Sequence, residues 1–175
     1  MKKIILLLVF AIFTVSCGGT YELLELKVNN DLTETIDVSI PKTTGATSIF
    51  NLSKTIDLRS GDFADYIDKI SAIKITSFTY RLKNFSGNSA GTIPLGNLKF
   101  DNTVVSTITN LNVSQEVNSQ TIFTVTDSAI LSQLENTFLN NTSTKIIASG
   151  NALSDEGSMN FVIEVNISLT ATITE

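Results

Sequence analysis

Alternation of apolar and polar residues dominates this chain and predicts an all-β protein. The C-terminal segment is the clearest case, because seven apolar side chains fall on one parity while mainly Asn, Glu, Ser and Thr occupy the other. The apolar set is Phe161, Ile163, Val165, Ile167, Leu169, Ala171 and Ile173. Side chains of a strand alternate between its two faces, so this segment should bury one face and expose the other.

The same alternation predicts further strands along the chain. We expect them at 24–28, 36–40, 54–58, 69–85, 92–100, 103–113, 116–126 and 145–150. Asn29-Asn30-Asp31 should form the turn between the first two strands, and Asp155-Glu156-Gly157 the hairpin turn before the last. Pro41 should end a strand, because proline cannot donate to the ladder of hydrogen bonds.

The segment 69–85 changes phase within its length. Its apolar residues are odd-numbered up to Ile75 and even-numbered from Phe78 onwards. A slip of one residue moves every side chain to the opposite face, so the change predicts a bulge or bend near Thr76-Ser77. Such a bend would allow one long strand to leave one sheet of a sandwich and join the other.

Two segments have helical patterns. Residues 127–139 place apolar side chains on one stripe, with Asp127 as the N-cap and Asn140-Asn141 at the end. The stripe consists of Ile130, Leu131, Leu134 and Phe138. A shorter helical turn is expected over 62–68, with Ser60 as its cap.

Eight or nine strands and one longer helix predict a two-sheet antiparallel sandwich of immunoglobulin-like type, formed as a single domain over residues 21–175. The resemblance to immunoglobulin domains concerns architecture alone. The chain has one cysteine and no tryptophan, so it lacks the buried cysteine pair and tryptophan of true immunoglobulin domains.

The N-terminus has the pattern of a secretory leader. Lys2 and Lys3 precede the apolar run 4–15, which is too short for a spanning helix of about 20 residues. Thr14-Val15-Ser16-Cys17 resembles the lipobox of bacterial lipoproteins. That resemblance implies that residues 1–16 are removed as a signal peptide and that Cys17 carries acyl chains.

The same resemblance implies a location. The protein would be anchored in a membrane of the bacterial cell envelope through the acyl chains on Cys17, with residues 17–20 as a short tether. Gly18 after the cysteine resembles the choice that sorts lipoproteins to the outer membrane. Two or three acyl chains hold a protein firmly on a bilayer, where a single chain does not.

The composition limits which partners, metal sites and cofactors can be expected. Removal of Lys2 and Lys3 leaves 10 basic against 17 acidic residues, a net charge of −7, which argues against nucleic acid as a partner. The chain has no histidine, and acylation would occupy its one cysteine. A zinc or copper site of the usual kind is therefore not expected, nor is any cofactor.

A calcium site is the alternative that the acidic residues raise. Asp57, Asp62, Asp65 and Asp68 cluster around the short helical turn. Calcium needs six to eight oxygen ligands, and this spacing does not match an EF-hand loop. Acidic residues in the first turn of a helix also serve to compensate its dipole.

Three functions remain, in order of preference. The first is a non-catalytic module that binds another envelope protein or a polysaccharide, or serves in assembly; Tyr21, Tyr66 and Tyr80 are the first candidates for its exposed patch. The second is a carrier of lipid or another hydrophobic ligand, with helix 127–139 as a gate over a large interior. The third is an enzyme that uses paired carboxylates, for which the sequence singles out no pair.

Substitution of Cys17 by alanine should leave an unprocessed precursor, because the thiol that receives the lipid is removed. The mass of the protein in isolated membranes would reveal the retained leader. Normal maturation of the variant would contradict the lipobox assignment.

Overall fold

The computed structural model describes residues 25–58 and 61–174. The signal peptide, Cys17, the tether, Tyr21 and Ser60 lie outside the described residues. The strands are β1 (Glu25–Ile40), β2 (Ser48–Asp57), β3 (Ile70–Gly87), β4 (Thr92–Phe100), β5 (Thr103–Asn112), β6 (Ile122–Thr124), β7 (Ser143–Leu153) and β8 (Met159–Thr174). The helices are η1 (Gly61–Phe63), η2 (Ile67–Lys69), α1 (Val113–Asn118) and α2 (Ser128–Asn140).

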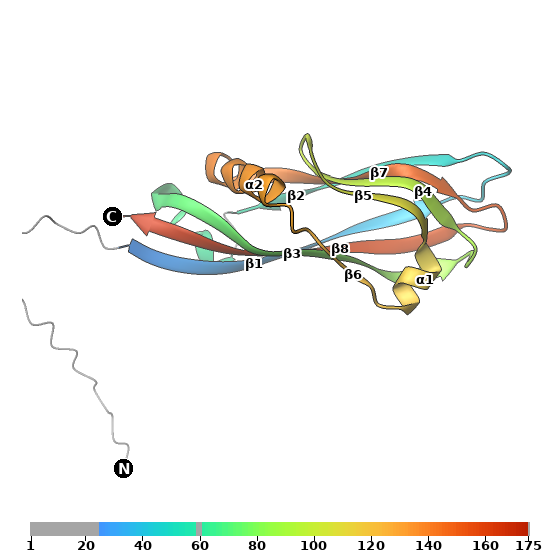
Figure 1. The fold of residues 1–175 in the computed structure, drawn as a ribbon, viewed down its shortest axis with the longest axis horizontal. Coiled ribbons are helices and arrows are strands. Elements are labelled where there is room, and N and C mark those ends of the chain that lie inside the picture. The colour runs from blue at the N-terminus through green and yellow to red at the C-terminus, as the bar shows by residue number, and fades with distance from the viewer. Residues whose placement is uncertain (1–24, 59–60, 175) are drawn as a thin grey trace, which may run out of the picture.

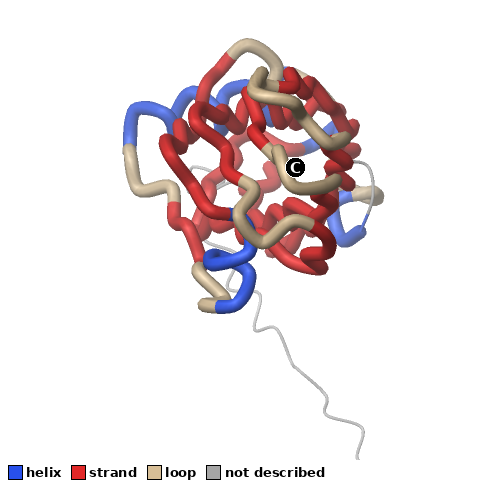
Figure 2. The backbone as a smooth tube through the Cα atoms, turned by 90° about the vertical axis from the view of Figure 1, so that its right-hand side faces the viewer, coloured by secondary structure: helices blue, strands red, loops and turns tan. Residues whose placement is uncertain are grey.

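The eight strands form two four-stranded antiparallel sheets (Figure 1). Sheet A has the order β1-β8-β3-β6, and sheet B has the order β2-β7-β4-β5. Viewed along the long axis, the strands enclose a common interior (Figure 2). The predicted all-β two-sheet sandwich is confirmed.

The strand order is that of a jelly roll. The first strand pairs with the last, the second with the second-last, and so on inward: β1 with β8, β2 with β7, β3 with β6 and β4 with β5. A long antiparallel hairpin that folds over on itself has this pairing. Contacts of β8 with β3 and of β7 with β4 complete the two sheets. The protein therefore shares the two-layer architecture of immunoglobulin domains, but its strands are connected in a different order.

Strand β8 lies in the middle of sheet A and has the two faces that its alternation predicted. Its odd-numbered side chains, from Met159 to Ile173, are buried against sheet B. Its even-numbered side chains lie on the outer face, where Glu164 is buried as well, with 7% of its surface exposed. The cause of this exception is a pair of cationic side chains, described below.

The turn expected at Asn29-Asn30-Asp31 was wrong, because β1 is one continuous strand of 16 residues. It pairs with β8 without a break, from Glu25 opposite Thr174 to Ile40 opposite Met159. A partner strand of the same length overrides the local turn preference of the asparagines. Pro41 follows directly after the strand, as expected.

The bulge predicted near Thr76-Ser77 is confirmed by a register shift between Ile75 and Ser77. The extra residue, Thr76, donates its hydroxyl to the Ser168 carbonyl at 3.1 Å. The expectation that the strand then changes sheets was wrong. β3 pairs with β8 from Ile70 to Gly87, because β8 is long enough to offer a partner throughout.

The strand expected at 116–126 was also wrong. This segment holds the second half of helix α1 and the short strand β6. The Asn112 side chain caps α1 by accepting a hydrogen bond from the Gln115 backbone N–H at 2.9 Å. Val113 is buried and Val117 packs against the core one helical turn later, so a helical spacing prevails over the alternation.

Helix α2 begins as predicted, with the Asp127 carboxylate accepting from the backbone N–H groups of Ala129 and Ile130 at 2.9 and 3.2 Å. Leu134 and Phe138 are buried in the core. The Phe138 ring meets Phe100 of sheet B edge to face, with a centroid distance of 5.9 Å. The helix therefore packs into the open side between the two sheets.

The helical turn predicted over 62–68 corresponds to η1 and η2. No described helix has the length and hydrophobicity needed to cross a bilayer. The described strands and helices and the buried cluster all lie between Glu25 and Thr174. A protein that starts at residue 18 therefore retains every contact of the described fold.

Replacement of Ile167 by aspartate should unfold the domain. Ile167 is 1% exposed at the centre of β8, so the substitution buries an unpaired charge and removes apolar contacts. We expect a loss of at least about 4 kcal/mol in the free energy of unfolding, measured by urea denaturation of residues 18–175. Thr172→Asp is the matched control, because it points outward on the same strand beside Lys27. A wild-type transition for Ile167→Asp would contradict the assignment of the buried face.

Candidate functional site

The aspartates that the sequence singled out lie on different elements. Of the four aspartates, Asp57 ends β2, Asp62 lies in η1 and Asp68 in η2. In the part of the chain that the structure describes, no group of three or more acidic side chains is arranged to hold a metal ion.

The two tyrosines in the described part of the chain, Tyr66 and Tyr80, do not form an exposed patch. Tyr80 is 5% exposed, and it points between the sheets, while Tyr66 is half-buried beside η2. Burial raises the pKa of the Tyr80 hydroxyl above its usual value, although a hydrogen bond with Ser106 acts in the opposite direction. Tyr80 is therefore mainly a core residue.

Side chains fill the space between the sheets. A cavity of about 20 Å³ lies among Phe50, Ile93 and Ile163, and another of about 50 Å³ lies beside Phe138 of α2. Pockets that hold small organic ligands usually measure about 300 to 1,000 Å³. These two cavities thus have room for one to a few water molecules.

The outer face of sheet A carries an ordered set of polar side chains. Three Ser/Thr–Asn pairs lie directly opposite one another on β1 and β8. Their hydroxyls donate to the amide oxygens, from Thr33 to Asn166 at 2.9 Å, from Ser39 to Asn160 at 2.6 Å, and from Thr170 to Asn29 at 2.8 Å. We call these six residues, together with Thr79, Arg81, Lys83 and Glu164, the sheet-A polar face.

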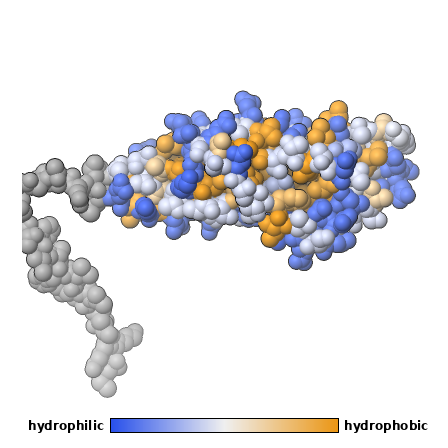
Figure 3. Space-filling view, viewed as in Figure 1, coloured by the Kyte–Doolittle hydropathy of each residue, from blue (hydrophilic) through white to orange (hydrophobic). Residues whose placement is uncertain are grey.

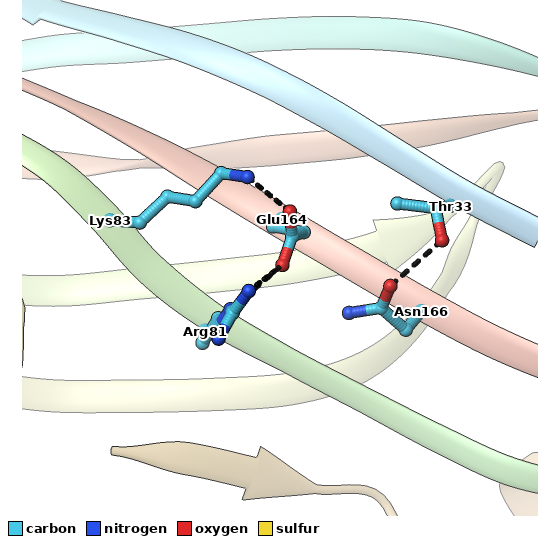
Figure 4. Close-up of polar contacts among 5 residues, drawn as sticks. All are labelled: Thr33, Arg81, Lys83, Glu164 and Asn166. Carbon is cyan, nitrogen blue, oxygen red and sulfur yellow. Dashed lines mark hydrogen bonds and ion pairs between the residues drawn. The ribbon is translucent and has the colours of Figure 1, made fainter. Parts of the chain in front are cut away.

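Glu164 is the charged centre of this face (Figure 4). One carboxylate oxygen, Oε1, accepts from Nε and lies close to Nη2 of Arg81, each at 2.7 Å, and Oε2 accepts from Nζ of Lys83. The hydrogen bond from Lys83, followed by that from Arg81, holds the pKa of the Glu164 carboxyl below its usual value although burial opposes the shift. The carboxylate in turn fixes the positions of two cations that are themselves partly exposed.

A hollow of about 270 Å³ lies beside this centre, between β6, β3 and β8. Thr79, Arg81, Glu164 and Asn166 supply its polar lining, and Ile122 of β6 borders it with 61% of its surface exposed. The polar groups here are hydroxyl, amide, guanidinium and one carboxylate already bound to two cations. Such a set can hold a ligand through hydrogen bonds, and it brings no second carboxylate into the hollow.

No protein-family model and no curated sequence matches this chain. A solved structure of the decameric BFDV capsid protein is similar over 83% of this chain and 99% of that chain, with 12% identity and a TM-score of 0.43. A structure of Desmodium yellow mottle tymovirus is similar over 83% and 90%, with 10% identity and a TM-score of 0.34. At these scores, neither likeness carries an argument about this chain.

The sequence alone does not single out the sheet-A polar face. The alternation places Asn160, Glu164 and Asn166 on the polar side of their strand. It does not show that Arg81 and Lys83, about 80 residues earlier, lie across from Glu164. The only sign of the cluster in the sequence is that Arg81 and Lys83 are two residues apart in a predicted strand, which puts both cations on one face.

Substitution of Glu164 by glutamine should lower the stability of the domain in a pH-dependent manner. The folded pKa lies below the usual 4.5, so the stabilisation is present above that value and is lost as the pH falls through the folded pKa. We expect the substitution to lower the free energy of unfolding by about 1 to 2 kcal/mol at pH 7. The loss is modest because solvent screens the partly exposed cations. Urea denaturation at pH 7 and pH 3 would show the difference shrink. Glu156→Gln, in the exposed hairpin turn, is the control; equal effects of the two substitutions would contradict the role of the cluster.

Proposed function

We propose that this chain is a lipid-anchored, non-catalytic binding module of the bacterial cell envelope, and that its sheet-A polar face binds a hydroxyl-rich polymer such as a polysaccharide. The observation that carries the proposal is that the polar side chains of this face hold one another in fixed positions. The three Ser/Thr–Asn pairs and the Glu164 cluster are held in place by hydrogen bonds within the protein. Side chains that are fixed beforehand lose little conformational entropy on binding.

The chemistry of the face suits sugar hydroxyl groups, which both donate and accept hydrogen bonds. Each paired asparagine uses its amide oxygen within the face, so its amide N–H groups remain available to a ligand. Arg81 adds further donors beside the hollow. Asn160 and Asn166 are six residues apart on β8, which corresponds to roughly 20 Å along a strand. A spacing of this size favours an extended polymer over a single sugar.

The anchor is part of the proposal and rests on the lipobox resemblance at Cys17. The mature net charge of −7 would not draw this protein to anionic headgroups, so acyl chains would supply the attachment. The short tether would keep the domain close to the membrane, which we propose to be the outer membrane. A polymer that lies next to that membrane is then within reach of the sheet-A polar face.

The interior supports the binding module over the carrier and the enzyme. The cavities among the core side chains, about 20 and 50 Å³, are far below the volume of a lipid chain. Leu134 and Phe138 tie α2 into the core, which does not favour the gate that a carrier would need. Glu164, the acidic residue that is buried in the described part of the chain, pairs with cations and not with a second carboxylate.

Removal of two amide donors should weaken polymer binding. We expect residues 18–175 to sediment with insoluble peptidoglycan, used as the test polysaccharide, and the Asn160→Ala/Asn166→Ala variant to bind about tenfold more weakly. The matched control is Asn51→Ala/Asn151→Ala, because these asparagines lie on the outer side of sheet B. The proposal fails if the wild-type protein stays in the supernatant, or if both double variants lose binding equally.

A further inference from the structure

Strands β5 and β6 are the end strands of sheets B and A on the same side of the sandwich (Figure 1). The chain between them crosses from one sheet to the other through α1. A groove of about 340 Å³ runs along β5 at this place. Its lining includes the consecutive residues 106–111 of β5, Glu116 of α1, Phe123 of β6 and Tyr80 of β3. We call it the β5 groove.

One wall of the β5 groove is an unpaired strand edge. Within the described residues, β5 pairs with β4 and with no other strand. Alternate N–H and C=O groups of an end strand point away from its neighbour, so those of 106–109 are available to another extended chain. Asn110 has a φ of 50° and interrupts the extended backbone after them.

The edge lacks two of the usual protections against added strands, although β5 does bulge at Val105, just before the residues that line the groove. Proteins place charged residues or proline on an exposed edge to prevent pairing, and β5 contains neither over its ten residues. The end strands on the other side of the sandwich do carry charge, for example Asp31 and Asp37 in β1 and Lys54 in β2. The exposed part of β5 is instead rich in threonine, with Thr107 and Thr109 facing solvent.

The floor of the groove is aromatic and rigid. The rings of Tyr80 and Phe123 stack with a centroid distance of 4.8 Å and an interplanar angle of 11°. The Tyr80 hydroxyl is hydrogen-bonded to the Ser106 hydroxyl at 2.7 Å, which fixes the floor to β5. Phe123 is partly exposed, and its neighbour Ile122 is 61% exposed. Apolar residues accordingly reach the surface on this side of the molecule (Figure 3).

A free strand edge beside a side-chain pocket is the arrangement that binds peptides by strand addition. Backbone hydrogen bonds supply affinity, and the pocket selects alternate side chains of the peptide. Glu116 is the one charged residue that lines the β5 groove. A complementary strand would therefore carry a basic side chain at that point.

We propose that the β5 groove binds an extended segment of a partner protein as an added strand on β5. An aromatic or aliphatic side chain of that segment lies over Phe123, and a lysine or arginine faces Glu116. The β5 groove adjoins the hollow beside Glu164, because Tyr80 lines both, but none of the six paired Ser/Thr and Asn residues lines the groove. The proposal therefore depends neither on polymer binding nor on the lipid anchor.

The test uses a phage library of random dodecapeptides selected on residues 18–175. We expect enriched sequences that combine alternating apolar residues with a basic residue. Synthetic copies should bind Phe123→Ala at least tenfold more weakly in fluorescence anisotropy. Leu95→Ala is the matched control, because Leu95 is an apolar side chain of sheet B that is 44% exposed outside the groove. Its affinity for the peptides should be unchanged.

Reversing the charges of Glu116 and of its partner in the peptide tests the contact by a gain of binding, which a misfolded variant would not show. Glu116→Lys should weaken the selected peptides, and replacement of their basic residue by glutamate should restore binding to this variant. Failure to enrich any peptide would overturn the proposal. So would peptides that bind Phe123→Ala as tightly as wild type, or a charge-exchanged peptide that does not recover binding.

Discussion

The pairing of β8 with β1 on one side and β3 on the other is the constraint on which the rest of the structure depends. β8 matches β1 residue for residue over its whole length, and β3 follows it with three register shifts. Its inward side chains form the middle of the core, and its outward side chains supply Asn160, Glu164 and Asn166. A shift of one residue would exchange these two sets. The same register therefore determines both the packing of the sandwich and the geometry of the sheet-A polar face.

Because the core is closely packed, we expect ligands to bind at the surface of the domain. The Phe100 ring meets Phe78 and Phe138 edge to face, at centroid distances of 5.4 and 5.9 Å, and so connects sheet A, sheet B and α2. These contacts leave little space inside. Two surfaces of different character remain, a rigid polar face on sheet A and a groove with an aromatic floor along β5. Hydrogen bonds to side chains would govern binding on the first, and hydrogen bonds to the backbone on the second.

Most of the fold class could be predicted from sequence because alternation is a local property. The faces of β8, the bulge at Thr76, the cap at Asp127 and the helix that follows it each depend on residues that are close in the chain. The errors occurred where a distant partner overrode a local preference. Asn29-Asn30-Asp31 became part of a strand because β8 extends beside it, and β3 stayed in sheet A for the same reason.

The sequence by itself determined that the chain would be an all-β sandwich, which faces of its strands would be buried, and where its longer helix would begin. Side-chain period and capping operate over a few residues, so these properties can be derived without a structure. The tertiary structure decided which strands are neighbours, and so produced the jelly-roll order, the contact of Arg81 and Lys83 with Glu164, and the open edge of β5. Each of these depends on pairing between segments far apart in the chain, and alternation contains no information about the identity of a partner.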